Sequence, residues 1–600
     1  MNDTANMSQA DRAAKRQREV PASGGAGAAG VAAREAVSPG GRRVRTYTAD
    51  ISAVGEPALW AFGGALALGI ILIAGFLAMI AWNGFTTFWP KPIAQVELRD
   101  GTTIAGEPTR GGTYRPGESV LVQLNDQQRA EIAENLGFAE RTLYKTANFD
   151  LYGDDFRWVS DFEVANVTYP TDMHLFQRQQ WGDFVGRVAG LVIAGEEVPF
   201  DYDLMQREQS EARRRFNEIR NIERSEIGAL NHYIERERLN IRRAELRHGA
   251  ESARGAELIA QSRERIAEYQ AQFADLQARV NDIRAIDRNY RVILEEVNGQ
   301  TKDTELSQIV RFYPANDLTT LDKTGIYFSR WWEFVSTEPR EANTQGGVLP
   351  AIFGTVAMTL LMVIFVAPFG VITALYLREY AKQGRITSIV RISVNNLAGV
   401  PSIVYGVFGL GFFAYAMGGT IDQLFYPEAL PNPTFGKGGI LWASLTLALL
   451  TVPVVIVASE EALAAVPRSM REGSLACGAS KWQTIRYVVL PKAMPGIMTG
   501  MILAMARGAG EVAPLMLVGV VKLAPALPID GFYPFIHLDR SFMHLGFHIF
   551  DVGFQSRNSE AGKPMVFVTT LLLLALIVTM NATAITVRNR LKRKYAGSQF

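Results

Sequence analysis

The chain has one cysteine, Cys477, in 600 residues, so no intramolecular disulfide can form. It also lacks the phosphate-loop motif G-x-x-x-x-G-K-[S/T], because Gly436-Lys437 is followed by Gly and Gly562-Lys563 by Pro. We therefore expect this chain to bind no cofactor, and any ATP to be hydrolysed on another protein. The formal net charge is only +1, which gives no indication of a nucleic acid partner.

Long apolar blocks dominate parts of the sequence. No A-x-A cleavage site or lipid-modified cysteine follows the first block, so we interpret it as a retained membrane span. About 20 helical residues cross the hydrocarbon layer, and six blocks are long enough. They are residues 57–83, 348–377, 397–418, 438–459, 494–521 and 564–587. The chain is predicted to be a multi-pass protein of the bacterial inner membrane.

Basic residues between the apolar blocks predict how the chain is oriented across the membrane. Arg and Lys gather after the second, fourth and sixth blocks, in residues 378–391, 468–486 and 588–594. The positive-inside rule then places both termini in the cytoplasm and residues 84–347 in the periplasm. Residues 1–56 lack helical or strand periodicity, which predicts a disordered basic tail, and residues 588–600 are a second basic cytoplasmic tail.

The first part of the periplasmic insert, residues 92–200, alternates apolar and polar side chains over short runs. Examples are VELRDGTTIAG, SVLVQL, FRWVSDFEVANVTY and RVAGLVIAG, separated by Gly and Pro. This pattern is typical of strands, so we expect a small, mainly β domain.

Residues 203–296 contain no proline and many Glu and Arg side chains. Apolar residues repeat every seven positions in two series, Ile259, Ile266, Phe273, Val280 and Tyr269, Leu276, Ile283, Tyr290, and earlier at Ile227, Ile234 and Ile241. Gly249 and Gly255 interrupt the pattern, which favours two helices folded into an antiparallel coiled-coil hairpin about 60 Å long. One continuous helix in an intermolecular coiled coil is the alternative. Either would serve as a spacer or docking arm.

The polar segment between the fourth and fifth blocks, residues 460–491, has its own amphipathic periodicity. A turn signal at Gly478 predicts two short helices that insert into a groove of a soluble partner. Its residues resemble the EAA loop of ABC importer permeases, with the same spacing: Glu472, Gly473, Ser474, Gly478, Val488, Leu490 and Pro491. Gly473 and Ser474 stand where that family has two alanines, and Val488 where it has isoleucine. The resemblance implies that this loop couples the spans to an ABC ATPase dimer.

Two charges, Arg507 and Glu511, lie in the fifth block. A charge inside the membrane costs at least about 2.5 to 3.5 kcal/mol, so the pair calls for a function or a partner. Four residues apart on a helix, the two side chains would share one face. A ridge of small residues on an adjoining face would let another helix approach: Gly496, Gly500, Ala504 and Gly508. A guanidinium matches the oxygens of phosphate or carboxylate, and an internal salt bridge between helices is the alternative.

Further segments extend the resemblance over residues 345–590. APFGVITALYLREYA, NNLAGVPSIVYGVFGLG and ARGAGEVAPL are similar to the permease subunits of the phosphate ABC importer, and closer to its A-type than its C-type subunit. The resemblance implies phosphate transport with Arg507 and Glu511 on the path and ATP with magnesium on the ATPase. It also implies a second, C-type permease and a periplasmic phosphate-binding protein. The 84–347 insert departs from that family, whose connection is far shorter.

The expected fold class is an α-helical integral membrane protein with six transmembrane helices of the ABC importer permease type, in residues 57–83 and 348–587, and the periplasmic insert. Another oxyanion such as sulfate or molybdate is an alternative cargo. A membrane scaffold or signalling protein is an alternative class, but it would not need the EAA-like loop. His544, His548 and Asp551 have spacing that could ligate a metal, but we favour ordinary packing and expect neither a metal nor a catalytic site.

Overall fold

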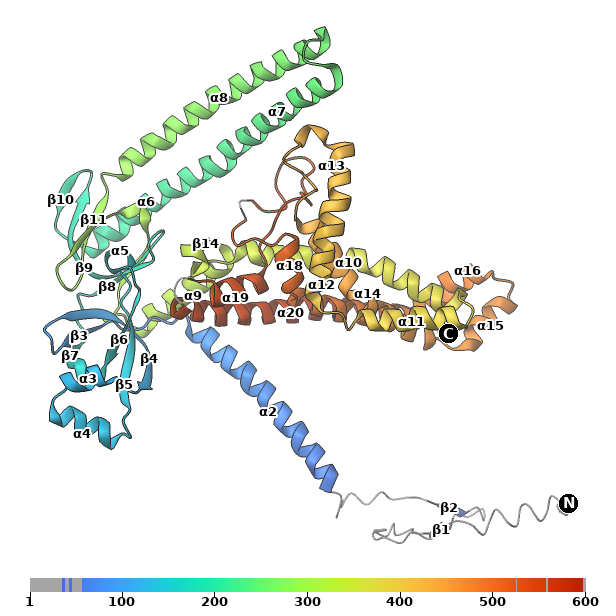
Figure 1. Cartoon of the computed structure of the whole chain (residues 1–600), viewed down its shortest axis with the longest axis horizontal. Helices are drawn as coiled ribbons and strands as arrows, with labels where there is room; N and C mark the ends of the chain where they lie inside the picture. The colour runs from blue at the N-terminus through green and yellow to red at the C-terminus, as the bar shows by residue number, and fades with distance from the viewer. Residues whose placement is uncertain (1–34, 38–42, 46–56, 525, 557–558, 597–600) are drawn as a thin grey trace, which may run out of the picture. The chain divides into compact units, whose positions relative to one another are not determined.

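The computed structural model describes residues 35–37, 43–45, 57–524, 526–556 and 559–596, and it divides into two compact units, residues 1–77 and 78–600 (Figure 1). The first unit holds a short antiparallel pair, β1 (Glu35–Val37) and β2 (Arg43–Arg45), and most of helix α2 (Pro57–Thr86). The predicted disordered tail otherwise lies outside the described residues. Helix α2 carries no charged residue and exposes large apolar side chains such as Leu66 and Ile73, as a lipid-facing span does.

Six helices in the described ranges are long and apolar enough to cross a membrane, which confirms the predicted number. They cover Trp60–Thr86, Leu349–Tyr380, Ser402–Phe425, Ile440–Ala464, Lys481–Gly510 and Glu560–Arg593. The fifth differs most from its prediction, because the structure begins it 13 residues earlier, at Lys481 instead of residue 494. The apolar block of the sequence therefore starts well inside this helix.

The second unit contains the other membrane helices, several of which include a π-helical turn. The second to fourth spans and their connections are α10 (Leu349–Leu375), η5 (Tyr376–Tyr380), α11 (Arg385–Leu397), α12 (Ser402–Phe408), η6 (Gly409–Gly418), α13 (Gly419–Phe425), η7 (Pro427–Ala429) and α14 (Ile440–Ala464). The remainder is α15 (Arg468–Ala476), α16 (Lys481–Thr484), η8 (Ile485–Val489), α17 (Leu490–Gly510), α18 (Ala513–Val518), α19 (Leu545–Phe554) and α20 (Ser559–Ala596).

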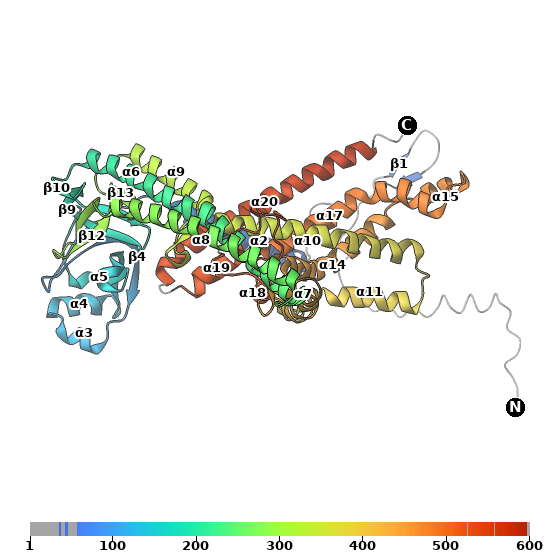
Figure 2. The same ribbon diagram turned by 90° about the horizontal axis from the view of Figure 1, so that it is seen from above.

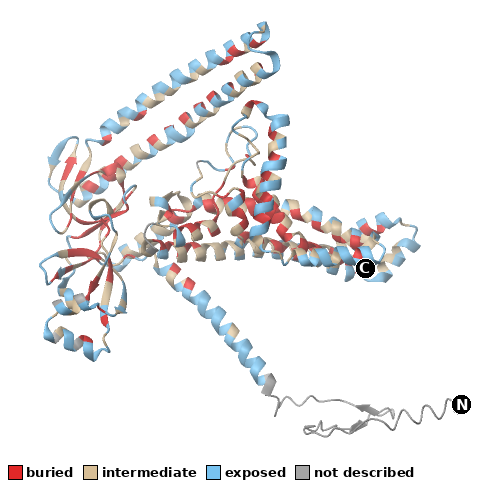
Figure 3. Ribbon diagram, viewed as in Figure 1, coloured by how far each residue is buried: buried red, intermediate tan, exposed pale blue. Residues whose placement is uncertain are grey.

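Helix α14 is the central element of the membrane helices. It packs between α10 and α17, and its apolar side chains, including Leu447 and Val455, join Met358 and Met362 of α10 in one buried core. Figure 3 shows the buried residues concentrated along these helices. Burial on all sides explains why the sequence of α14 is apolar all round and shows no amphipathic pattern.

Helix α20 continues through the predicted C-terminal tail. It ends at Ala596, so residues 588–596 are helical. The segment RNRLKRKYA consists mainly of good helix formers and contains no Gly or Pro, which lets the last span extend beyond its apolar part.

The insert predicted at residues 84–347 contains two larger antiparallel sheets. The first has the order β6 (Phe156–Ser160), β5 (Ala139–Lys145), β4 (Thr103–Tyr114), β3 (Ala94–Leu98) and β7 (Val164–Thr168). The second has the order β12 (Thr301–Glu305), β11 (Arg291–Glu295), β9 (Asp183–Ile193), β8 (His174–Arg178) and β13 (Ile309–Pro314), with β10 (Glu196–Val198) beside β9. The predicted β region ended near residue 200 and is therefore incomplete, because β11 to β13 return after the hairpin.

One segment predicted as a strand is a helix. SVLVQL lies in α3 (Glu118–Gln123), which is followed by α4 (Asp126–Glu134). Its Val122 is exposed, so no sheet covers the alternating side chains. The Arg129 guanidinium donates to the carbonyls of Leu121 and Val122 at 2.8 Å, and these bonds hold the end of α3 against α4.

A pair of long helices projects from the second sheet, between β10 and β11. The chain runs through α6 (Tyr202–Asn221), η2 (Ile222–Ile227) and α7 (Gly228–His248), reverses at Gly249, and returns in α8 (Ala253–Asp287). Helices α7 and α8 lie side by side (Figures 1 and 2), and Arg265 pairs with Glu237 across them at 2.8 Å. Ile234, Ile259 and Val280 are buried, while the coiled-coil seam itself stays a prediction.

Short elements complete the insert and lead into the membrane helices. Helix α5 (Phe149–Tyr152) lies between β5 and β6, and α9 (Thr320–Ser336) follows β13. The strands β14 (Pro339–Arg340) and β15 (Gln345–Gly346) then lead into α10. Glu341, Ala342 and Asn343, between these two strands, all have positive φ angles, which is a strained conformation for residues other than glycine.

Candidate coupling loop, charge pair and external cavity

Residues 460–491 form a helix-turn-helix. Helix α15 ends at Ala476, and Gly478 has φ +84°, the left-handed conformation that favours glycine after a helix. The Ser480 side chain then accepts a hydrogen bond from the Gln483 amide, and the Gln483 side chain accepts one from the Ser480 amide. This reciprocal capping box starts the next helix, so the sequence fixes both sides of the turn locally.

Arg471 attaches this loop to two spans. Its guanidinium lies 2.9 Å from Glu379 Oε1 in η5 and donates to the carbonyls of Leu463 and Val466 at the end of α14. Lys481 also donates to the Glu379 carbonyl. Because these contacts reach both α14 and the end of α10, a displacement of the loop would be passed to both helices.

The residues of the EAA-like pattern line both sides of the turn. Glu472, Gly473 and Gly478 are exposed, Ser474 contacts Thr484 Oγ1 at 3.0 Å, and the half-buried residues lead into α17: Val488, Leu490 and Pro491. Three large exposed side chains, Leu475, Trp482 and Tyr487, add apolar surface on the same loop. Our sequence reasoning missed these three, although aromatic residues beside a predicted turn were the available signal. Exposed apolar side chains of this kind are suited to a groove of a soluble partner.

The structure brings Arg507 and Glu511 together, but not on one helix. Helix α17 ends at Gly510, and Glu511 is extended with ψ 133°. The prediction that both lie on one helical face is therefore wrong. Pro514 explains the break, because its ring would clash with the carbonyl four residues earlier, at Gly510, if the helix continued. The side chains still approach to 3.6 Å between Arg507 Nε and Glu511 Oε1, and both are partly exposed.

The ridge of small residues on α17 faces two other helices. A Cβ atom added at Gly496 or Gly500 would lie 2.5 Å from the Cβ of Ala462 or Ala458 on α14. Ala504 is fully buried, and a Cβ at Gly508 would lie 2.5 Å from the Met362 sulfur on α10. The backbone of α17 thus approaches α14 more closely than larger residues would allow.

The histidines of α19 are buried among other side chains. His544 Nδ1 accepts a hydrogen bond from the Gly546 amide, and His548 lies near Thr569. Asp551 pairs instead with Lys522 at 3.2 Å and accepts from Asn343. No group of three or more His, Cys, Asp or Glu side chains in the described residues is placed to hold a metal ion.

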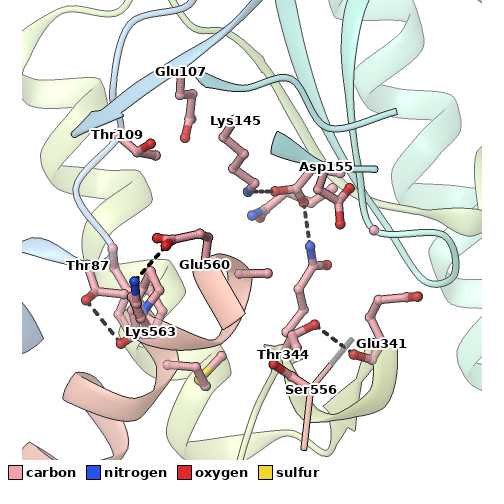
Figure 4. A pocket seen from close by; sticks show the side chains of 18 of the residues that line it. Thr87, Glu107, Thr109, Lys145, Asp155, Glu341, Thr344, Ser556, Glu560 and Lys563 are labelled. Carbon is pink, nitrogen blue, oxygen red and sulfur yellow. Dashed lines mark hydrogen bonds and ion pairs between the residues drawn. The ribbon is translucent and has the colours of Figure 1, made fainter. Parts of the chain in front are cut away.

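A cavity of about 950 Å³ lies where the external sheets meet the ends of the membrane helices (Figure 4). Its lining comes from the end of α2, from β4 and β5, from α9 and from the start of α20. Seven basic and six acidic side chains face it. This cavity could not be predicted from local sequence patterns, because the residues that meet there are up to several hundred positions apart.

Charged side chains in the cavity are paired across its walls. Arg110 of β4 lies 2.8 Å from Glu560 of α20, and Lys563 lies 2.6 Å from the same carboxylate oxygen. On another wall Lys145 pairs with Asp183. Burial raises the pKa of the Asp155 carboxyl to about 6, and the nearby Asp183 and Glu341 carboxylates act in the same direction. A carboxyl with this pKa changes its charge close to neutral pH.

The membrane domain is similar to a known protein family. Residues 366–593 match the family model described as "Binding-protein-dependent transport system inner membrane component". This part of the chain is therefore similar to permease components of ABC transporters, as the sequence predicted, and ATP hydrolysis on a separate subunit stays a prediction.

Individual relatives show which permeases the chain resembles. The chain is 35% identical over 195 residues to "Probable ABC transporter permease protein YqgH" of Bacillus subtilis, covering 32% of this chain and 59% of that protein. It is also 35% identical over 205 residues to "Phosphate transport system permease protein PstA 1" of Mycobacterium tuberculosis, covering 34% and 61%. The chain thus spans about 60% of the length of these relatives. The expected resemblance to phosphate permeases is confirmed.

Solved structures of ABC transporters also match. An inward-facing MetNI methionine ABC transporter is 18% identical with a TM-score of 0.30, covering 41% of this chain and 95% of that one. A bacterial transporter for the acidic polysaccharide alginate is 15% identical with a TM-score of 0.31, covering 43% and 84%.

Proposed function

We propose that this chain is a permease subunit of an ATP-driven importer of inorganic phosphate. The observation that carries the proposal is one continuous segment that joins the helix-turn-helix around Gly478 to the Arg507–Glu511 pair through α17. An ATP-driven importer of an anion requires a surface that a soluble ATPase can bind and a charged group in the membrane domain. Relatives named as phosphate permeases support the choice of anion.

In this proposal a dimer of ABC ATPase subunits, which carries ATP and magnesium, grips α15 and α16 from the cytoplasm. Arg471 passes the movement to α10 and α14 through Glu379 and the end of α14, and the spans alternate between outward-facing and inward-facing states. A periplasmic phosphate-binding protein delivers the anion, and a second, C-type permease completes the path. Both termini are then cytoplasmic and residues 84–347 periplasmic.

Arg507 would stabilise the phosphate in transit, because its guanidinium donates several hydrogen bonds to oxyanion oxygens. Glu511, at 3.6 Å, would orient Arg507 and keep anion binding weak enough for release. Since Glu511 lies beyond the end of α17, it can move relative to Arg507 without unwinding that helix.

The test is uptake of radiolabelled phosphate by cells that produce Arg507→Ala or Glu511→Ala. We expect each variant to lose at least about 90% of uptake, which corresponds to 1.4 kcal/mol or more at the rate-limiting step. Arg263→Ala, an exposed arginine on α8, is the matched control and should behave as wild type. Wild-type rates in both path variants, at normal membrane levels, would rule out the assignment. Competition by unlabelled sulfate or molybdate separates phosphate from the other oxyanions.

A further inference from the structure

The external cavity contains a carboxylate that occupies the position of a bound anion. One oxygen of Glu560 accepts from Arg110 Nη2 at 2.8 Å and from Lys563 Nζ at 2.6 Å. Arg110 belongs to the external sheet and Lys563 to the last membrane helix, so the two cations converge although they are far apart in sequence. An oxygen of a bound oxyanion would accept hydrogen bonds from the same two charged donors.

Other walls of the cavity carry carboxylates that are not held in a salt bridge among the described residues. Glu107, Asp155 and Glu341 form no salt bridge with another residue in the part of the chain that the structure describes. In Figure 4, Asp155 and Glu341 lie across the cavity from Glu560 and Lys563. Such carboxylates repel an anion that has no proton, but they accept a hydrogen bond from one that has.

The two converging cations and the carboxylates on the other walls together favour a ligand that both accepts and donates hydrogen bonds. Sulfate is fully ionised at neutral pH and can only accept hydrogen bonds. Inorganic phosphate keeps one or two protons in the same range, so it can accept from the cations and donate to a carboxylate at once. The cavity is far larger than one phosphate ion, and its charged lining side chains suit a hydrated ion.

We propose that this cavity binds inorganic phosphate, with Arg110 and Lys563 holding its oxygens in place of the Glu560 carboxylate and Asp155 accepting a hydrogen bond from its protonated oxygen. The choice of phosphate rests in part on the proposed function, whereas the position of the site rests on the cavity. Neither Arg507 nor Glu511 lines the cavity, so this site is separate from the charge pair of the membrane domain. It joins the external insert to α20, and phosphate bound there would replace a contact between them.

The experiment titrates the full-length protein, purified in detergent, with inorganic phosphate and with sodium sulfate at pH 7.5 by calorimetry. Arg507→Ala is the background in every sample, which removes the other charged site. We expect Arg110→Gln combined with Lys563→Gln to weaken phosphate binding at least about tenfold, because two charged hydrogen bonds are lost. Asp155→Asn should reduce the preference for phosphate over sulfate.

Glu560→Gln best separates a phosphate site from a purely structural salt bridge. It removes the internal carboxylate that competes with the ligand, so phosphate should bind more tightly, by about threefold or more. A merely structural salt bridge between Arg110 and Glu560 would not produce this gain. The control is Arg263→Gln on α8, which should bind phosphate as the background does. Thermal unfolding of each variant shows that it is folded.

Three results would overturn the proposal: no phosphate binding in the background protein, unchanged affinity in the double variant, or sulfate binding as tight as phosphate. Each is independent of the uptake assay. If uptake depends on Arg507 and the titration fails, only the cavity proposal is wrong. If the titration succeeds and uptake ignores Arg507 and Glu511, the proposed function is wrong and the cavity remains an oxyanion site.

Discussion

Arg471 Nη2 lies 2.9 Å from Glu379 Oε1, which ties the helix-turn-helix of residues 468–484 to the end of the second span. Both side chains are largely buried, with 18% and 12% of their surface exposed, so water screens the pair less than it would a surface salt bridge. The same guanidinium donates to two carbonyls at the end of α14. One residue therefore connects the loop to two helices of the membrane domain.

We predict that Arg471→Ala uncouples ATP hydrolysis from transport. Removing the guanidinium leaves Glu379 and the carbonyls of Leu463 and Val466 without this donor, so the loop should move without displacing α10 and α14. The expected result is a fall in uptake of about tenfold, with ATPase activity of the purified complex retained. Arg468→Ala, an exposed residue of the same helix, is the control. Equal losses of uptake in both variants would contradict the role given to Arg471.

The close approach of α17 and α14 yields a second prediction. A methyl group at Gly500 would lie 2.5 Å from the Cβ of Ala458, so Gly500→Ala forces the two helices apart. Overpacking of this kind costs about 1 to 3 kcal/mol, and the detergent-purified protein should unfold at a lower temperature.

The matched rescue for this variant is Ala458→Gly. Because it removes the methyl group on the opposite helix, the double variant should recover most of the lost stability. Gly473→Ala, where nothing lies within 4 Å of the added carbon, should not lower the unfolding temperature, because Ala favours a helix more than Gly does. If the double variant unfolds no later than Gly500→Ala, the contact is not the cause.

A third prediction concerns the contact between α7 and the external loop of the third span. Arg243 pairs with Glu428, whose side chain is only 4% exposed, and nearby His232 stacks on Phe532 with ring centroids 4.4 Å apart. Arg243→Ala leaves a buried carboxylate without its partner, which costs about 1 to 3 kcal/mol. We expect faster proteolysis of residues 228–248 in the intact membrane protein. Arg243→Ala with Glu428→Gln should restore resistance, and Arg238→Ala on the exposed side is the control.

Properties that depend on a single stretch could be predicted from the sequence. The membrane spans follow from the length of apolar blocks, and the turn at Gly478 follows from local capping residues. The end of α17 was missed, although Pro514 was a signal for it, because the apolar block continues beyond Gly510. The strands after residue 290 were missed because they join the sheet across the whole helical hairpin, where β11 pairs with β9 and β13 with β8.

The external cavity belongs to a different class of feature. Arg110 and Glu560 are 450 positions apart, and no local pattern marks either as part of a site. Only the folded chain brings them together, so residue types and spacing alone could not identify them. The Arg507–Glu511 pair, by contrast, was predictable because charges inside an apolar block are conspicuous.

The pKa of Asp155 leads to the last prediction. Burial raises this pKa to about 6 in the folded protein, from about 3.8 when the residue is solvated. The folded state therefore holds the proton more tightly than the unfolded state, and this contribution to stability is fully present below about pH 4. It is lost as the pH rises through 6, where the buried carboxyl must ionise. Asp155→Asn mimics the neutral form, so it should raise the unfolding temperature at pH 8 and leave it unchanged near pH 4.

The measurement is thermal unfolding of the purified full-length protein across pH 4 to 8, with the difference between variant and wild type as the readout. Asp282→Asn, an exposed carboxylate on α8, should show no rise at pH 8. The difference in unfolding temperature between Asp155→Asn and wild type should reach half of its final size roughly midway between the two pKa values. The cost of ionising Asp155 in the folded protein grows only over the pH range in which the folded and unfolded states bind different numbers of protons. An effect of equal size at pH 4 and pH 8 would mean that Asn stabilises by packing, and that Asp155 is not the group that changes its charge near neutral pH.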